Sequence, residues 1–403
     1  MPPRSIAYSG AVIGEAEIAA VLAVLKSGDI HPGERVLAFE RRCAALLGKR
    51  HGAMVNSGSS ALVVAMRLLD LPPGSEVATS VLTFSTDVSS IAQTGCVPVF
   101  ADCELDTYQV DLDALERAIG PRTRALLVPN LIGGMPDWDR LRALADRHDL
   151  ALVEDSCDTL GGTLRGRPPG ERADLSVTSF SPRHIITALG IGGLVAVDDA
   201  ARWDRALVLR GWGRSSEPVL FGSRREGYRG RFESQLDGID YDSLFVFEES
   251  AYGFIPSEAA AAFGLAQLDR LDEFTHQRRA LFERHQAFFR GHAELFLAPR
   301  VPDEVRTTWL AFPVQLRPET GWTRKSFQMH LMDAGIDNRV IFTGNVTRQP
   351  MMRGIAHRAD PAGYPNADQV MRQGTLLPCF PGMSDEDCAY LYGVVEDYVR
   401  KMR

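Results

Sequence analysis

The chain has very few lysines. Of its 403 residues, 44 are lysine or arginine, and only four of these are lysines: Lys26, Lys49, Lys325 and Lys401. A lysine amine is the usual protein group that forms a Schiff base with a carbonyl compound. Any such chemistry in this protein is therefore restricted to four positions.

Long hydrophobic runs and paired cysteines are also absent. No apolar stretch approaches the roughly 18 to 20 residues that span a bilayer. The first residues lack the basic and then apolar pattern of a signal peptide. The six cysteines lie far apart, with no CxxC pair, which is typical of reduced thiols rather than of a disulfide framework. We therefore expect a cytoplasmic protein that does not enter the membrane.

An excess of positive charge is missing as well. The formal net charge is −8 and the pI is about 5.7, so neither nucleic acid nor an anionic membrane is an expected partner. The nine histidines show no HExxH or paired Cys/His spacing, so no metal site is expected. A composition of 45% hydrophobic and 24% charged residues is that of a globular protein and excludes disordered and fibrous classes.

The first half of the chain alternates between two kinds of hydrophobic pattern. Helical spacing is found over 35–47, 61–71, 112–119 and 138–148. Short apolar runs lie between these helical patterns, at 51–55, 76–78, 97–101, 124–129 and 151–154. Buried strands separated by crossover helices predict a mostly parallel sheet covered on both faces. Such sheets bind ligands at the carboxyl ends of their strands.

The pattern then changes twice. Residues 214–249 are polar, arginine-rich and without periodicity, so we expect a long insertion without regular structure. Residues 257–290 have helical spacing and are expected to lead into a smaller C-terminal unit. That unit is expected to contain a strand and two helices, at 310–316, 325–334 and 385–399. We therefore predict a large α/β domain over 1–260 and a small α+β domain over 261–403.

Three segments carry residues suited to binding or catalysis. The first, Asn56-Ser57-Gly58-Ser59-Ser60, lies between an apolar run and a helical pattern. A helix N-terminus with small residues leaves N–H groups and the positive end of the helix dipole free, which suits a phosphate. A plain serine N-cap explains the same pattern, so this segment alone does not decide between the two.

The second segment begins with the strand predicted over 151–154, which ends in acids, and it contains Glu154, Asp155 and Asp158. Acids at the carboxyl end of a buried strand lie where α/β proteins bind ligands. A carboxylate there can keep a pyridine nitrogen protonated, which makes the ring an electron sink. Acids that cap the following turn are the alternative interpretation.

The third segment runs from Ser176 to Gly193. An apolar strand turns at Pro182, presents His184, and continues through glycines into a second apolar strand at 194–197. A lone histidine is more often structural than catalytic, so the neighbouring segments must decide its role.

Together these segments resemble the DegT/DnrJ/EryC1/StrS family of sugar-modifying enzymes, which use pyridoxal phosphate (PLP) and have the aspartate aminotransferase fold, fold type I. NSGSSAL resembles the family's phosphate-binding turn, VEDSCDTLGG its pyridine-nitrogen strand, and SFSPRHIITALGIGG its SFxPxK segment. The position of the family's Schiff-base lysine holds His184. This replacement resembles the nucleotide-sugar 3-dehydratases of the GDP-4-keto-6-deoxymannose and CDP-4-keto-6-deoxyglucose types.

The resemblance implies a role for each matching residue. Gly58, Ser59 and Ser179 are expected to bind the cofactor phosphate. Asp155 is expected to pair with the pyridinium nitrogen. Asp158 is expected to lie near the 3-hydroxyl group of the ring.

Phe84 is expected to stack on the ring, and His184 is expected to be the catalytic base. Without an ε-amine at this position the cofactor is held non-covalently, as its amine form, pyridoxamine phosphate (PMP). None of the four lysines lies on a segment expected at the carboxyl edge of the sheet. An imidazole with a pKa near ~6.5 can accept a proton at neutral pH, whereas a lysine amine is already protonated.

These roles imply dehydration at C3 of a 4-keto sugar, nucleotide-linked, with glutamate as the amino donor and a homodimer as the assembly. In the CDP-sugar type the insertion carries the cysteine ligands of a 2Fe–2S cluster. Residues 214–249 contain no cysteine, so neither a cluster nor a partner reductase is expected.

Other residues lie in segments that match the subgroup less closely. Tyr252, Asn345 and Arg348 are expected to contact the substrate. Gly253 stands where the family has an asparagine that reaches the neighbouring subunit, and Ile191 stands where an acid is common, so a more apolar pocket is expected. The arginines of the insertion are interpreted either as a diphosphate clamp or as a solvated loop: Arg214, Arg224, Arg225, Arg229 and Arg231.

Three alternative functions remain open from the sequence. One is PMP-dependent elimination or tautomerisation on a non-nucleotide ketose or cyclitol. Another is an ordinary sugar aminotransferase. The last is a scaffold or sensor that binds the cofactor without catalysis.

Overall fold

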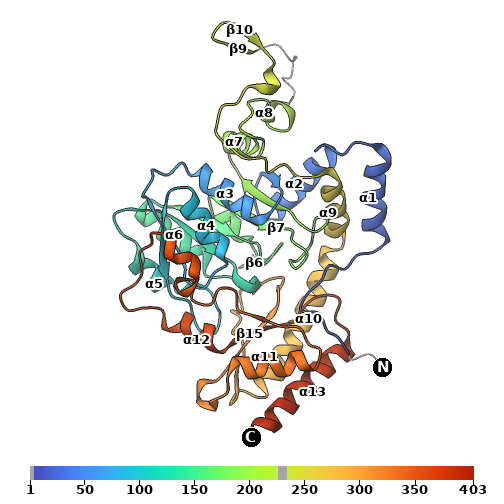
Figure 1. Cartoon of the computed structure of the whole chain (residues 1–403), viewed down its shortest axis with the longest axis vertical. Helices are drawn as coiled ribbons and strands as arrows, with labels where there is room; N and C mark the ends of the chain where they lie inside the picture. The colour runs from blue at the N-terminus through green and yellow to red at the C-terminus, as the bar shows by residue number, and fades with distance from the viewer. Residues whose placement is uncertain (1–3, 226–233) are drawn as a thin grey trace.

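The computed structural model describes residues 4–225 and 234–403, and its largest element is a seven-stranded sheet (Figure 1). Six strands run in one direction, and β8 is antiparallel to both of its neighbours. Across the sheet the strands are β1 (His51–Val55), β8 (Gly193–Val197), β7 (Leu175–Ser179), β5 (Ala151–Asp155), β4 (Thr123–Pro129), β2 (Glu76–Ser80) and β3 (Val97–Ala101). The predicted mostly parallel sheet is confirmed.

Both faces of this sheet are covered by helices. Leu127 and Val153 enter the core on one face, and their chain neighbours Leu126 and Leu152 enter the core on the other. Because successive side chains of a strand point to opposite faces, a sheet buried on both sides needs nearly continuous apolar strands. The covering helices include α3 (Gly58–Leu68) and α7 (Ala200–Arg210) on one face, and α5 (Leu112–Ala118) and α6 (Trp138–His148) on the other.

A second, antiparallel sheet lies in the lower part of Figure 1. Its order is β11 (Phe296–Leu297), β13 (Phe312–Leu316), β15 (Gly374–Leu377) and β14 (Arg339–Val340), and α11 (Arg324–Asp333) and α13 (Asp385–Met402) pack with it. Its core is rich in aromatic rings, with Phe312 in contact with Phe282 and Phe289. From the N-terminal segment, Ile6 pairs with Ile336 and is buried in the same core.

The helical pattern over 257–290 is interrupted. It forms two helices, α9 (Glu258–Asp269) and α10 (Leu271–Arg290), which are separated by Arg270 with φ −105° and ψ 5°. The expectation of a single helix is therefore wrong. The apolar spacing continues through Arg270, so the hydrophobic pattern does not show where the first helix ends. The predicted domain boundary at 260/261 falls within α9 and stays a prediction.

The insertion extends away from the rest of the chain (Figure 1). Its described part contains α8 (Glu217–Leu220) and a hairpin of β9 (Ser234–Leu236) and β10 (Ile239–Tyr241), so the expectation of no regular structure is wrong. Asp237 and Gly238 form the turn, both with positive φ. This dipeptide is a strong hairpin signal, but the strands beside it are short and exposed. Arg229 and Arg231 lie outside the described residues.

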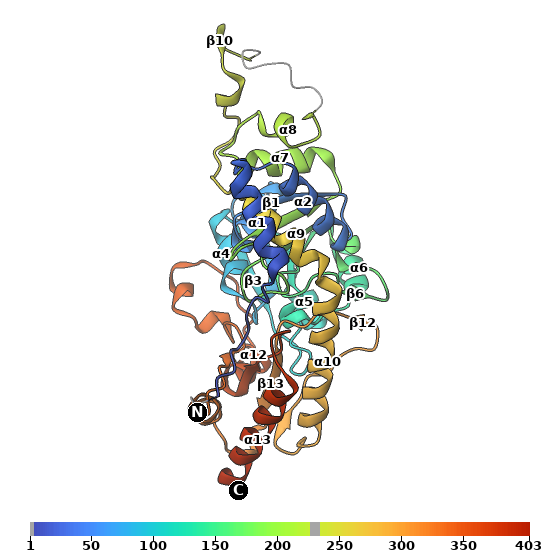
Figure 2. The ribbon, with the colours of Figure 1, turned by 90° about the vertical axis from the view of Figure 1, so that its right-hand side faces the viewer.

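Five of the described α-helices have no counterpart in the sequence-based prediction: α1, α4, α7, α8 and α12 (Pro365–Gln373). Helix α1 (Glu15–Ser27) packs beside α9, as Figure 2 shows. Helix α4 (Ser85–Gln93) reads STDVSSIAQ and contains many residues of modest helix propensity. Within residues 4–225 and 234–403, no helix combines the length and hydrophobicity needed to cross a membrane.

Candidate active site

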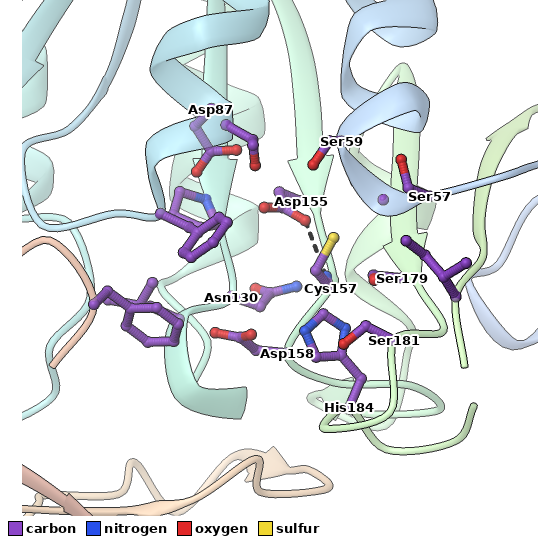
Figure 3. Close-up of a pocket in the computed structure, with 17 residues that line it drawn as sticks. Ser57, Ser59, Asp87, Asn130, Asp155, Cys157, Asp158, Ser179, Ser181 and His184 are labelled. Carbon is purple, nitrogen blue, oxygen red and sulfur yellow. Dashed lines mark hydrogen bonds between the residues drawn. The ribbon is translucent and has the colours of Figure 1, made fainter. Parts of the chain in front are cut away.

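The carboxyl ends of β4, β5 and β7 open into a cavity of about 240 Å³ (Figure 3). This edge of a parallel sheet is where α/β proteins bind ligands. Seven of the residues singled out in the sequence line the cavity: Gly58, Ser59, Phe84, Asp155, Asp158, Ser179 and His184. Ile191 lines it as well, so the structure brings together residues from four distant segments.

The N-terminus of α3 forms one wall. Ser57 caps the helix by accepting a hydrogen bond from the Ser60 amide at 3.1 Å, and Ser59 is exposed at the cavity. Gly58 permits the close approach of β7, because a Cβ there would lie 2.6 Å from the Ser179 Cβ. Free N–H groups at a helix N-terminus, beside serine hydroxyls, suit a phosphate.

Two carboxyl groups follow β5. Asp155 Oδ1 accepts a hydrogen bond from the Cys157 amide at 2.9 Å, and Asp158 Oδ2 accepts one from the Ile132 amide at 2.8 Å. Ile132 has φ 62°, a strained backbone conformation for a β-branched residue. Burial raises the pKa of both carboxyl groups, that of Asp158 to about 8. Acids with raised pKa values in a cavity are typical of functional sites.

A third acid, Asp87, also lines the cavity and has no counterpart among the predicted site residues. It lies in the first turn of α4 and is fully buried. The Thr83 hydroxyl donates a hydrogen bond to Asp87 Oδ2, and the carboxyl group of Asp155 faces it. Burial and the charge of Asp155 raise the pKa of Asp87 well above its usual range. No sequence signal marked Asp87, because it lies nine residues after the run predicted over 76–78 and in a helix of weak sequence pattern.

Two aromatic rings face the cavity. Phe84 and Phe342 make an edge-to-face contact, with ring centroids 6.3 Å apart and an interplanar angle of 82°. Phe84 is 52% exposed, so its ring is available to stack on a planar ligand. Phe342 follows β14 in the second sheet, and no sequence signal marked it.

His184 extends into the cavity from the loop after β7 (Figure 3). Among the described residues its Nδ1 has no hydrogen-bond partner. Burial lowers the pKa of His184 to about 4, and the positive charge of Arg278 acts in the same direction. The imidazole is therefore neutral at pH 7 and able to accept a proton.

None of the four lysines, all of which lie in the described part of the chain, lines this cavity. Lys49 is buried elsewhere and donates hydrogen bonds to the Ala173 carbonyl at 2.5 Å and to Asp198 at 2.8 Å. The others lie in helices: Lys26 in α1, Lys325 in α11 and Lys401 in α13. The cavity thus holds an imidazole and no amine.

A second cavity, of about 640 Å³, adjoins the first. The two share four lining residues: Phe84, Ser181, His184 and Phe342. Arg183 and Arg339 add guanidinium groups to the wall of the second cavity, and Tyr8 adds a phenol. Guanidinium groups bind phosphate and carboxylate oxygens well, so this space suits a ligand that carries an anionic group.

Three residues predicted to contact the substrate line neither cavity. Tyr252 is 46% exposed and stacks on Phe254, with ring centroids 4.8 Å apart. Asn345 and Arg348 both donate hydrogen bonds to the carboxylate of Asp368. Their contact with a substrate stays a prediction.

The described arginines of the insertion also lie away from both cavities. Arg225 pairs with Glu34, and the Arg214 guanidinium lies over the Trp212 ring. Arg224 Nε lies 3.9 Å from a carboxylate oxygen of Asp204. The diphosphate clamp therefore stays a prediction.

The model of the DegT/DnrJ/EryC1/StrS aminotransferase family matches residues 11–396. The chain belongs to this family. The dTDP-4-dehydro-2,6-dideoxy-D-glucose 3-dehydratase of Saccharopolyspora spinosa is 32% identical to it over 405 residues, which cover 98% of this chain and 86% of the relative. The resemblance inferred from the three sequence segments is confirmed.

Solved structures of the same fold include both dehydratases and aminotransferases. The E. coli GDP-4-keto-6-deoxy-D-mannose 3-dehydratase with bound hydrated PLP is 24% identical, has a TM-score of 0.86, and matches over 97% of this chain and 100% of its own. The aminotransferase TlmJ from Streptoalloteichus hindustanus is 25% identical, has a TM-score of 0.83, and matches over 98% and 99%. The predicted fold class is confirmed.

Proposed function

We propose that this protein is a lyase that uses PLP and PMP to remove the C3 hydroxyl group of a nucleotide-linked 4-keto sugar. The observation that carries the proposal is His184, an imidazole in a cavity that no lysine lines. Membership of the family and the likeness to a named 3-dehydratase support sugar deoxygenation. A sugar aminotransferase is the second candidate, because the fold and sequence also match TlmJ.

The cavity residues fit the cofactor in size and chemistry. Gly58 and Ser59 at the N-terminus of α3, with Ser179, would hold the phosphate. Asp155 would hold the pyridine nitrogen, and Asp158 would hold the ring hydroxyl. Oxygen acceptors, N–H donors and space are thus present for each polar group of the ligand.

When bound, the cofactor supplies an amino group that reacts with the sugar carbonyl and an electron-poor ring that stabilises developing negative charge. Phe84 would cover the ring and limit the access of water. His184 would be the base that takes up a proton at the carbon beside the amino group, and it would give a proton to the departing C3 hydroxyl, which would leave as water. Because the pKa of His184 is about 4, the base is neutral at pH 7.

The second cavity provides a place for the nucleotide side of the substrate. Arg183 and Arg339 would pair with its diphosphate. We further propose glutamate as the amino donor, and a homodimer in which the exposed Tyr252 faces the partner subunit. No reductase is needed in this scheme, because residues 214–249 supply no cysteine ligands.

An absorption spectrum tests the cofactor part of the proposal. The protein is mixed with PLP and then with L-glutamate, and spectra are taken before and after desalting. We expect a shift from the aldehyde band to the PMP band, with no cofactor fixed to the protein by borohydride. A stable yellow form that borohydride fixes to a lysine would instead favour the aminotransferase.

The product of the reaction separates the two candidates. The PMP-loaded protein is incubated with nucleotide-linked 4-keto sugars, and the products are analysed by mass spectrometry. A dehydratase gives a sugar that lacks the C3 oxygen, whereas an aminotransferase gives an amino sugar that retains it. An amino sugar as the main product would contradict the proposal.

A further inference from the structure

The cavity contains a pair of carboxyl groups, Asp87 and Asp155, that the mechanism above does not use as a pair. Asp87 comes from α4 and Asp155 from the end of β5, and Figure 3 shows their carboxyl groups facing each other. Asp87 is fully buried and Asp155 is 6% exposed. Both are therefore held in a site with little access to water.

The hydrogen bonds of the pair leave one oxygen in need of a proton. Thr83 donates to Asp87 Oδ2, and the Cys157 amide donates to Asp155 Oδ1. In the described part of the chain no donor reaches Asp87 Oδ1. Two ionised carboxylates that face each other in a buried site repel each other, so such a pair retains one proton between them. The charge of Asp155 adds to burial in raising the pKa of Asp87, so the proton resides on Asp87.

Other titratable groups surround the pair. Cys157 and Asp158 face it from the loop after β5, and His184 from the loop after β7, while α3 presents only glycine and serine. Asp158 also raises the pKa of Asp87, and its own pKa is about 8. No lysine or arginine is among the residues that line the cavity. The negative charge of the pair is thus left for a ligand to neutralise.

We propose that Asp87 and Asp155 form a proton store that delivers one proton to the ring nitrogen of the cofactor as it binds. The inference rests on the proposed function, since it needs a pyridine ring in the cavity. The O–H bond of the pair breaks and an N–H bond forms on the ring, so both carboxylates end ionised beside one pyridinium. No electron is transferred and no solvent proton is consumed. Asp87 acts through Asp155 and is a positioning residue.

Calorimetric titration of the cofactor-free protein with PMP tests this transfer. It is run in two buffers of different ionisation enthalpy, at a pH above that at which the ring of free PMP loses its proton. The difference in heat between the buffers gives the number of protons taken from solvent. We expect about zero for the wild type. Asp87→Asn keeps the shape and the hydrogen bonds but stores no proton, so it is expected to take up about one per PMP bound.

Asp113→Asn is the control, because it makes the same replacement at an exposed carboxyl group that does not line the cavity. Its proton uptake is expected to equal that of the wild type. Equal uptake by the wild type and Asp87→Asn would overturn the inference, and so would the same change in uptake in Asp113→Asn. Failure of all three proteins to bind PMP would contradict the proposed function instead.

An infrared measurement keeps the inference testable if Asp87→Asn does not fold. The Asp158→Asn protein is examined at the same pH before and after PMP is added, so that the pair holds the only carboxyl groups that line the cavity. The difference spectrum removes the bands of acids buried elsewhere, such as Glu40 and Glu154. We expect it to show the loss of the carbonyl band of a protonated carboxyl group when PMP binds. A difference spectrum without this loss would overturn the proton store.

Discussion

Arg278 of α10 donates a hydrogen bond of 3.2 Å from Nη2 to the carbonyl oxygen of His184, although the two residues are 94 positions apart in the sequence. Its Nη1 donates to the carbonyl oxygens of Trp309, Leu310 and Cys379, at 2.9 to 3.1 Å. The side chain is buried, and burial lowers its pKa to about 10. One guanidinium group thus fixes the loop of the proposed base against the second sheet.

Arg278→Met is expected to destabilise the protein. The replacement preserves much of the apolar volume but removes the donor of four buried carbonyls, and each unsatisfied acceptor costs about 1–3 kcal/mol. For four acceptors we expect the free energy of unfolding in urea to fall by about 4 kcal/mol or more. The pKa of His184, followed by NMR, is expected to rise because the charge of Arg278 lowers it.

Arg353→Met is the control for this change, since Arg353 is exposed. Its effect on the free energy of unfolding is expected to stay within about 0.5 kcal/mol. Equal unfolding curves for the two variants would show that Arg278 does not support the loop.

Gly58→Ala tests the contact between α3 and β7. The added Cβ would lie 2.6 Å from the Ser179 Cβ and 3.2 Å from the Cys157 Sγ, so the start of the helix must move. We expect a loss of about 1–3 kcal/mol in stability and roughly tenfold weaker PMP binding, about 1.4 kcal/mol. Gly354→Ala is the control, because its Cβ meets no heavy atom within 4 Å. Equal PMP affinities in the two variants would contradict a phosphate site at α3.

His184→Asn is expected to separate binding from chemistry. Asparagine retains polarity and similar bulk but is not a base, so PMP should still bind while elimination slows by roughly 10²–10⁴-fold. Binding is measured by calorimetry and elimination by release of the deoxygenated sugar. His276→Asn, on the exposed side of α10, should leave both unchanged. Full activity in His184→Asn would exclude it as the base.

The stability of the cofactor-free protein at alkaline pH should depend on Asp158. Burial raises its folded-state pKa to about 8, from the ordinary value of 3.8. The folded state therefore binds the proton more tightly, and this contribution to stability is present at low pH and lost as the pH rises through about 8. Asp158→Asn has no such loss, so its stability relative to the wild type should rise between about pH 4 and pH 8 and stay constant above that.

Thermal unfolding across the pH range measures this difference. Asp113→Asn is the control, because hydrogen bonding to Arg140 lowers the pKa of that exposed carboxyl group. The stability of Asp113→Asn relative to the wild type should not change at neutral and alkaline pH. If the stability of the wild type and of Asp158→Asn changes in parallel with pH, then Asp158 is ionised in the folded protein over the whole pH range measured.

Much of the site was predictable because its residues follow local patterns. The strands β1, β5 and β7 are short apolar runs, and the parallel strands of one sheet share a carboxyl edge. Residues just after those runs, such as Gly58, Asp155 and His184, therefore had to gather there. The absence of a nearby lysine was likewise visible in the sequence, since only four lysines exist.

Other features needed the tertiary structure. Asp87 faces Asp155 only because α4, a helix of weak sequence pattern, brings it to the same cavity as the end of β5. Phe342 and Arg278 reach the site from the second sheet and from α10, far along the chain. Hydrophobic periodicity determines which face of an element is buried, but not which elements meet. The sequence by itself thus determined the fold class, the cavity edge and the imidazole, and only the packing of distant elements decided the carboxyl pair and the anchor of the His184 loop.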